Sequence, residues 1–154
     1  MNSDFKDLLR AFSEENVRYL VVGGYAFAEH VEPRYTKDLD VWIERTAENA
    51  DRVLAALRSF GAPLRELAKD DLTSPGTFYQ IGLPPSRIDI ITQLEEMDFA
   101  ECWNRRKTGQ IGDLAVEFIS APDLMENKER TGRPHDLADL EHLRQAQKER
   151  ESGK

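Results

Sequence analysis

Apolar side chains recur at helical spacing in several parts of the chain. Near the start, Phe5, Leu8, Leu9 and Phe12 follow an i, i+3, i+4, i+7 pattern, which predicts an amphipathic helix capped by Ser3. Similar stripes, with glycine and proline marking their ends, predict further helices. The predicted helices cover residues 4–15, 25–31, 47–60 and 99–107, a segment between Ser120 and Gly132, and a last helix that Pro134 opens, with Leu137, Leu140 and Leu143 inward.

Short runs rich in β-branched and aromatic residues predict strands between these helices. The runs cover residues 17–22, 39–43, 77–83, 87–92 and 114–119, and Asp38 stands at the entry of the second. Pro84, Pro85 and Ser86 are expected to join the third and fourth runs as a hairpin, whereas residues 62–76 show little periodicity. The order of elements predicts an α+β fold, in which helices cover one mixed β-sheet and the C-terminal segment is helical.

Length and composition fit a single domain. The chain has 154 residues, 40% of them hydrophobic and 32% charged, so we expect one domain over residues 1–147 and a polar tail over 148–154. No apolar run approaches the roughly 18 residues that a membrane span needs. Residues 1–10 carry mixed charge and lack the apolar centre of a signal peptide. We therefore expect a cytoplasmic protein without a membrane partner.

Cysteine content and charge narrow the possible chemistry. Cys102 is the one cysteine, which excludes an internal disulfide, and without a Cys-His pattern around it a buried structural role is expected. The net charge is −8, whereas domains that hold nucleic acid by its backbone usually show a basic patch. The one dense basic cluster, Arg105-Arg106-Lys107, is interpreted as a solvated helix end. Charge therefore does not favour a nucleic-acid partner, although it leaves one open.

Two carboxylates share one face of the second predicted strand. Side chains alternate along a strand, so Asp38 and Asp40 lie on the face of Trp42, and the opposite face is apolar. The two carboxylates are then roughly 7 Å apart, close enough to converge on hard cations such as Mg²⁺. Phosphoryl-transfer enzymes often use a pair of such ions, for which two carboxylates rarely suffice. A third carboxylate is therefore expected from a neighbouring strand.

Asp89 is the best candidate for that third carboxylate. It lies in the apolar strand 87–92, on the face that also carries Arg87 and Ile91. Burying an aspartate in such a strand is expensive without a partner, and a shared metal ion would supply one. The alternative for Asp38 and Asp40 is a simple turn and capping role at the strand entry.

A pair of glycines precedes the first candidate carboxylates. Gly23 and Gly24 follow the first strand directly and open a helix, a place where the backbone approaches a ligand closely and helix N–H groups favour phosphate. Arg34, Thr36 and Lys37 lie in the segment that returns to Asp38, and Arg34 is a candidate phosphate partner. One element thus offers donors for a triphosphate, and the next offers carboxylates for its metal.

These motifs together resemble the signature of the polymerase-β-like nucleotidyltransferase superfamily. The segment Val21-Val22-Gly23-Gly24 is followed after thirteen residues by Asp38-Leu39-Asp40-Val41. The segment from Arg34 to Asp40 is similar to the minimal nucleotidyltransferases of bacterial and archaeal genomes, which include toxin-type members of abortive-infection toxin–antitoxin systems. Asp123-Leu124, Lys128 and the run from Gly132 to Asp139 resemble the closing segment of these proteins, and residues 62–76 remain unmatched.

The resemblance implies a metal-dependent transfer of a nucleoside monophosphate from an NTP, such as ATP, to an acceptor hydroxyl. Asp38 and Asp40 would bind two Mg²⁺ ions, and Asp89 would bind the catalytic one and help to deprotonate the acceptor. Gly23 and Gly24 would hold the triphosphate, with Arg34, Thr36 and Lys128 as further contacts. Larger relatives add a helical domain, so a partner protein, a second copy or the acceptor (tRNA, protein or small molecule) is expected to complete the cleft.

Several residues have plainer interpretations. Asp136 and Asp139 are expected to favour the start of the last helix, with a second acidic site as the alternative, and Lys128 and Arg133 either touch phosphate or cover the surface. The histidines show no metal-ligand spacing, and core packing is favoured for Trp42 over stacking on a base. For the whole chain, the alternative to an enzyme is a non-catalytic nucleotide-binding or antitoxin-like module that keeps the fold.

Overall fold

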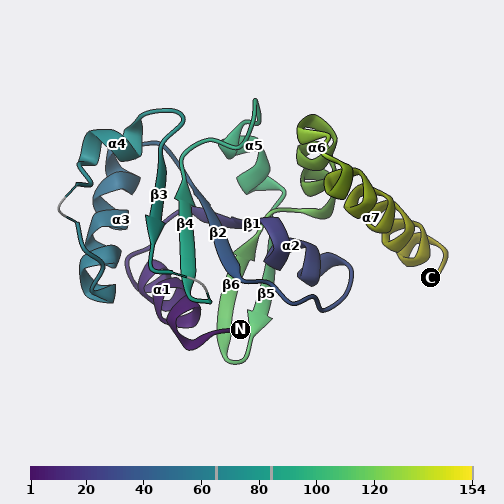
Figure 1. Ribbon diagram of the computed structural model, residues 1–154, viewed down its shortest axis with the longest axis horizontal. Coiled ribbons are helices and arrows are strands. Elements are labelled where there is room, and N and C mark those ends of the chain that lie inside the picture. The colour runs from purple at the N-terminus through teal and green to yellow at the C-terminus, as the bar shows by residue number, and fades with distance from the viewer. Residues whose placement is uncertain (65, 84, 154) are drawn as a thin grey trace.

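A single mixed sheet organises the chain, whose computed structural model describes residues 1–64, 66–83 and 85–153 (Figure 1). Pro84 of the predicted hairpin turn and Lys154 of the predicted tail lie outside the described residues. The sheet has six strands in the order β3-β4-β2-β1-β6-β5. Their bounds are β1 Tyr19–Val22, β2 Asp38–Ile43, β3 Phe78–Ile81, β4 Arg87–Ile91, β5 Lys107–Ile111 and β6 Leu114–Phe118.

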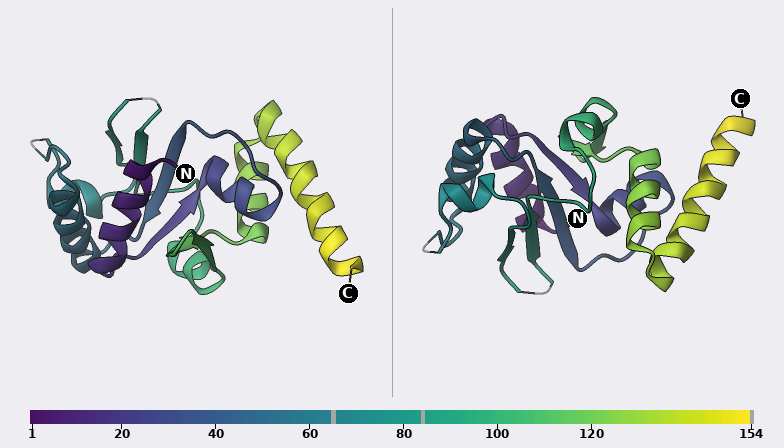
Figure 2. Two further views of the ribbon diagram at one scale, coloured as in Figure 1. Left: turned by 90° about the horizontal axis from the view of Figure 1, so that it is seen from below. Right: turned by 90° about the horizontal axis from the view of Figure 1, so that it is seen from above.

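Helices connect these strands and close the chain. Their bounds are α1 Ser3–Glu14, α2 Gly23–His30, α3 Ala47–Phe60, α4 Lys69–Thr73, α5 Phe99–Asn104, α6 Ala121–Thr131 and α7 Pro134–Ser152. α1 and α3 pack together at one end of the sheet, whereas α6 and α7 form a pair at the opposite end (Figures 1 and 2). The predicted α+β fold with one mixed sheet and a helical C-terminal segment is confirmed.

The central strand β2 places its two carboxylates and its apolar side chains on opposite faces. β1 runs antiparallel to β2, and β2 runs parallel to β4. Leu39, Val41 and Ile43 of β2 are fully buried in the core, as the strand alternation predicts. The alternate face carries Asp38 and Asp40 and ends at Trp42, which packs edge-on against Phe99 of α5 with ring centroids 5.0 Å apart.

Helix ends follow the expected chemistry, with one exception. Gly61 and Gly132 end α3 and α6 in left-handed conformations, and the Ser120 hydroxyl accepts a hydrogen bond of 3.1 Å from the Asp123 N–H at the start of α6. At the first helix the cap is Asn2 rather than Ser3, because the Asn2 side chain accepts the Asp4 N–H at 2.7 Å. Ser3 is the first residue inside the helix.

Two elements were not predicted. α5 ends at Asn104, and Lys107, the last residue expected in that helix, is the first residue of β5, which pairs antiparallel with β6. The pairing satisfies a full hydrogen-bond ladder, which outweighs the weak helical periodicity of this stretch. α4 lies within the aperiodic stretch 62–76 and buries Leu72 completely. Its five residues are too few for a periodic pattern to identify.

The last helix differs in two respects from expectation. α7 continues to Ser152, so the described part of the predicted polar tail is helical and exposed. Leu140 and Leu143 are buried as predicted, whereas Leu137 is 50% exposed, because the buried positions beside it belong to Asp136 and Asp139. Within the described ranges, no helix is long and apolar enough to cross a membrane.

Candidate functional site

Asp38, Asp40 and Asp89 lie on adjacent strands of the sheet. The parallel register of β2 and β4 pairs Asp40 with Asp89, and Asp38 with Arg87. Paired residues of neighbouring strands stand about 4.8 Å apart and point to the same face, so Asp40 and Asp89 are direct neighbours. The structure thus brings together the three carboxylates that the sequence singles out, although α3, α4 and β3 lie between Asp40 and Asp89 along the chain.

The environment of Asp40 disfavours the charged form of its carboxylate. Burial raises its pKa, and the negative charge of Asp89, a hydrogen bond to Asp89 and the charge of Asp38 raise it further, to about 7. The positive charge of Arg87 opposes this shift. Carboxylates crowded in this way strongly favour a cation between them, because a cation replaces repulsion with attraction.

Arg87 supplies such a positive charge from within the chain. Its Nε and Nη2 atoms donate to the two oxygens of Asp89, each at 3.0 Å, and Asp89 is only 4% exposed. Strand alternation predicts that Arg87 shares the face of Asp89, but the chelate itself was not predicted. The spacing of Arg87 and Asp89 could have indicated this contact, because oppositely charged residues two apart on a strand share one face.

Asp38 carries a buried oxygen without a protein partner. Its Oδ1 atom is inaccessible to solvent and accepts no hydrogen bond within the described residues. Such an atom is expensive to leave unsatisfied, so it points to a ligand that this face of the sheet receives.

The glycine turn, formed by Gly23 and Gly24, lies against these carboxylates. Val22, the last residue of β1, pairs with Asp40 across the strands, and Gly23 then adopts a positive φ of 67° and begins α2. A Cβ atom on Gly23 would collide with the Asp40 carboxylate, whose Cγ would be 3.2 Å away. The start of α2, where N–H groups have no intrahelical acceptor, therefore adjoins the carboxylate face.

The carboxylate oxygens of this face are of the kind that Mg²⁺ prefers, although the side chains do not enclose a cation position. In the described ranges, no group of three His, Cys, Asp or Glu side chains is arranged around a cation position. Asp89 is held by Arg87 instead. Carboxylate oxygens, the unpartnered Asp38 oxygen and the mutual repulsion at Asp40 all suit a hard cation. Asp38, Asp40 and Asp89 would hold the metal once Arg87 releases Asp89.

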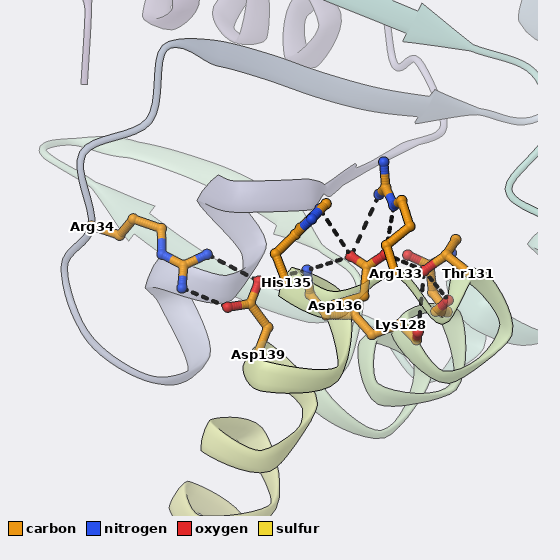
Figure 3. A network of polar contacts seen from close by, with 8 residues as sticks. Arg34, Lys128, Thr131, Arg133, His135, Asp136 and Asp139 are labelled. Carbon is orange, nitrogen blue, oxygen red and sulfur yellow. Dashed lines mark hydrogen bonds and ion pairs between the residues drawn. The ribbon is translucent and has the colours of Figure 1, made fainter.

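The other predicted ligand contacts divide into two places. Thr36 lies at the glycine turn, where a Cβ on Gly24 would come within 2.8 Å of its Cγ2. Arg34 and Lys128 instead meet at Asp139 of α7 (Figure 3). Lys128 is buried and 7% exposed, so its ammonium is not presented to a ligand here. That Arg34 and Lys128 contact a nucleotide therefore stays a prediction.

Core packing of Trp42 and burial of Cys102 are confirmed. Trp42 is 2% exposed and packs in the core, and Cys102 is a buried free thiol whose pKa burial raises to about 12. His30 is buried and bonds the Ile119 carbonyl oxygen through Nε2 at 2.6 Å. Asp136 and Asp139 do lie in the first turns of α7, but their role as buried ion-pair partners was not predicted.

Comparisons with known proteins give relationships at the level of structure. No protein-family model matches the chain, and no curated protein matches its sequence. Among solved structures, the chain is similar to the nucleotidyltransferase ANT(2'')-Ia in complex with adenylyl-2''-tobramycin, with a TM-score of 0.59, 14% identity, and coverage of 90% of this chain and 84% of the other.

A second similar structure is a candidate nucleotidyltransferase from Thermotoga maritima. The TM-score is 0.60 at 16% identity, with 94% of this chain and 91% of the other covered. Identities at this level relate folds rather than activities. The six-stranded mixed sheet, its covering helices and these neighbours together establish that the chain has the nucleotidyltransferase-like fold.

Proposed function

We propose that the chain transfers a nucleoside monophosphate from a nucleoside triphosphate to an acceptor hydroxyl, with Mg²⁺ as cofactor. The observation that carries the proposal is the cross-strand pair of Asp40 and Asp89, of which the Asp40 carboxylate lies directly against Gly23 of the glycine turn. This arrangement joins a phosphate-binding helix start to a set of carboxylates. The fold of the chain is similar to that of ANT(2'')-Ia, a structure that contains an adenylylated aminoglycoside, and this similarity supports the same class of reaction.

Each residue has a role in that reaction. The glycine turn binds the triphosphate, since it allows backbone N–H groups to approach phosphate oxygens without a side chain in between. Asp38, Asp40 and Asp89 hold the metal, which supplies charge neutralisation for the phosphates. The acceptor oxygen forms a bond to the α-phosphorus as the bond to the leaving pyrophosphate breaks. Asp89 helps to remove the acceptor proton.

The test is incubation of the protein with each α-labelled NTP, Mg²⁺ and cell extract, followed by identification of the labelled species. We expect one labelled acceptor with the wild type and none with Asp38→Ala/Asp40→Ala. Asp113→Ala, which alters a side chain that is 94% exposed in the β5–β6 turn, is the matched control and should label normally. Failure with all four NTPs, despite metal binding, would overturn the catalytic claim.

A second function is favoured by one observation. Arg87 neutralises Asp89, and Arg34 and Lys128 are paired with acidic residues, so the described conformation does not present the full catalytic set. The second candidate is accordingly a non-catalytic module that binds nucleotide or a partner protein. Tight NTP binding in a thermal-shift assay, without transfer to any acceptor, would favour this module over the enzyme.

The acceptor belongs to the same proposal. We include in it a second copy, a partner protein or the acceptor itself as the group that contributes to the nucleotide site beside α6 and α7. We include a toxin-type role in the cytoplasm, with tRNA, a protein or a small molecule as acceptor. Expression of the wild type and of Asp38→Ala/Asp40→Ala in a bacterial host tests this role, because a toxin-type transferase arrests growth only when its carboxylates are intact.

A further inference from the structure

A cluster of charged side chains, most of them buried, joins the segment after α2 to the distant helices α6 and α7 (Figure 3). Arg34 comes from the return segment (residues 31–37, between α2 and β2), Lys128 from α6, and Asp136 and Asp139 from α7. Both aspartates and the lysine are almost fully buried, at 2%, 6% and 7% exposure. Lys128 lies between the two carboxylates, with its Nζ atom 2.9 Å from Asp139 and 3.5 Å from Asp136.

Asp139 holds the guanidinium of Arg34 by both of its oxygens. The two hydrogen bonds measure 2.7 Å and 3.1 Å, the geometry in which arginine and carboxylate bind most strongly. The guanidinium also lies 3.7 Å above the ring of Phe27 on α2. Arg34 is therefore fixed from two sides, by a charge from α7 and by an aromatic face from α2.

The helix α7 touches the neighbourhood of the return segment at two further points. Arg150 donates a hydrogen bond to the carbonyl of His30, the last residue of α2. The ring of His142 packs edge-on against Phe27, with centroids 6.5 Å apart. Asp139, His142 and Arg150 lie along one helix, so α7 packs beside the end of α2 and the segment that follows it.

The return segment in turn packs on the glycine turn. The side chain of Thr36 fills the space above Gly24, so closely that a Cβ there would be 2.8 Å from Thr36 Cγ2. The hydroxyl of Tyr25 donates to the Thr36 carbonyl at 3.3 Å. A continuous path of contacts therefore runs from Asp139 through Arg34 and Thr36 to Gly24, and the next residues of the chain enter β2 at Asp38.

We propose that Asp139 is a positioning residue, which through Arg34 holds the return segment against the glycine turn and so shapes the nucleotide site. The effect on nucleotide binding rests on the proposed function, whereas the holding of the return segment rests on geometry alone. Asp139 touches no reacting atom in this scheme. Its carboxylate acts through the backbone between Arg34 and Asp38.

The test compares Asp139→Asn with the wild type by amide hydrogen exchange and by nucleotide affinity. Asparagine keeps the size of the side chain and a hydrogen bond to Lys128, but it gives up the charge that chelates Arg34. We expect faster exchange in residues 31–37 and an about tenfold weaker Kd for the NTP that the wild type binds most tightly, the change that 1.4 kcal/mol represents. Glu141→Gln, on the same helix with a side chain 75% exposed, is the matched control and should alter neither quantity.

A double-mutant cycle distinguishes positioning from general destabilisation. Arg34→Lys keeps the charge but loses the bidentate fork, and it alters a partly exposed side chain, so it also serves if Asp139→Asn folds poorly. The effects of the two substitutions on Kd should be clearly less than additive, because both break one link. Additive effects, or equally faster exchange throughout the protein, would overturn the proposal.

The outcomes separate this inference from the proposed function. Unchanged exchange in residues 31–37 overturns the inference, even if the wild type binds and transfers nucleotide normally. Loosening of the segment with an unchanged Kd also overturns it, because the segment would then have no part in the nucleotide site. If the wild type binds none of the four NTPs, the proposed function fails, and the exchange data alone decide whether Asp139 holds the segment.

Discussion

Gly23 lies so close to the carboxylate of Asp40 that no side chain fits between them. The contact joins the start of α2 to the middle of the carboxylate face. It is also the point at which the backbone turns with a positive φ of 67°. Both properties make position 23 the most restrictive in the candidate site.

Gly23→Ala should therefore be destabilising and should abolish NTP binding. The left-handed backbone costs a residue with a Cβ about 1–2 kcal/mol, and the collision with Asp40 adds to this. Gly112→Ala isolates the first contribution, because Gly112 has a φ of 64° and open space around its Cα. Urea unfolding of both variants measures the difference. Equal losses of stability would show that the contact with Asp40 is unimportant.

Asp40→Asn should stabilise the metal-free protein at alkaline pH. The pKa of Asp40 is raised from its ordinary value to about 7 in the folded state, so the folded protein favours the protonated form. The contribution of protonated Asp40 to the free energy of unfolding is fully present below about pH 4 and is lost as the pH rises through 7. At pH 8 in EDTA we expect the free energy of unfolding of Asp40→Asn to be about 2 kcal/mol higher than that of the wild type.

The control for this measurement is Asp113→Asn, at an exposed carboxylate. Added Mg²⁺ should reverse the order, because the wild type gains a ligand that the variant binds poorly. A variant that is less stable than the wild type at pH 8 without metal would contradict the raised pKa.

Arg87→Gln should strengthen metal binding and weaken the metal-free fold. The guanidinium occupies both oxygens of Asp89, which a cation needs. Without it, the Kd for Mn²⁺, measured by electron paramagnetic resonance, should fall about tenfold, a change of 1.4 kcal/mol. The melting temperature in EDTA should drop, since a buried carboxylate loses its counter-charge. Weaker Mn²⁺ binding would mean that Arg87 supports the metal-bound geometry of Asp89.

Asp136 should contribute to stability in a defined acid range. Burial by itself would raise its pKa, but hydrogen bonds from Arg133 and Thr131 and the charge of Lys128 outweigh burial and lower the pKa to about 2. The contribution is present above the ordinary value near 4 and is lost as the pH falls towards 2. Asp136→Asn should therefore flatten the acid limb of a plot of unfolding free energy against pH by up to about 2 kcal/mol. An unchanged acid limb would contradict this role.

Local patterns were sufficient for the central part of the site. Alternation along β2 places Asp38 and Asp40 opposite buried Leu39 and Val41, and the glycines at the end of β1 need no knowledge of other strands. Asp89 could be selected because an aspartate in an apolar strand needs a partner. That it lies directly opposite Asp40 is a matter of register, which depends on the parallel pairing of two distant strands.

Pairings between distant residues account for β5 and for the partners of Arg34 and Lys128, none of which the sequence predicted. β5 exists because β6 offers it a hydrogen-bonding edge, and its own residues carry no strong strand signal. The sequence offers several acidic residues as ion-pair partners for Arg34, and only the packing of α7 brings Asp139 next to it. For the same reason, Lys128 could not be identified in advance as a buried partner of two carboxylates.

The separation of Arg34 from Asp139 by 105 positions has a consequence for biosynthesis. A chain that emerges from the ribosome exposes the glycine turn and all three carboxylates well before α7 is complete, because synthesis runs from the N-terminus at a limited rate. The nascent chain therefore holds every predicted ligand of the metal while its return segment is still untethered. Arg34 can form its ion pair only after Asp139 has been synthesised, so the order of translation delays the tethering of this segment until α7 forms.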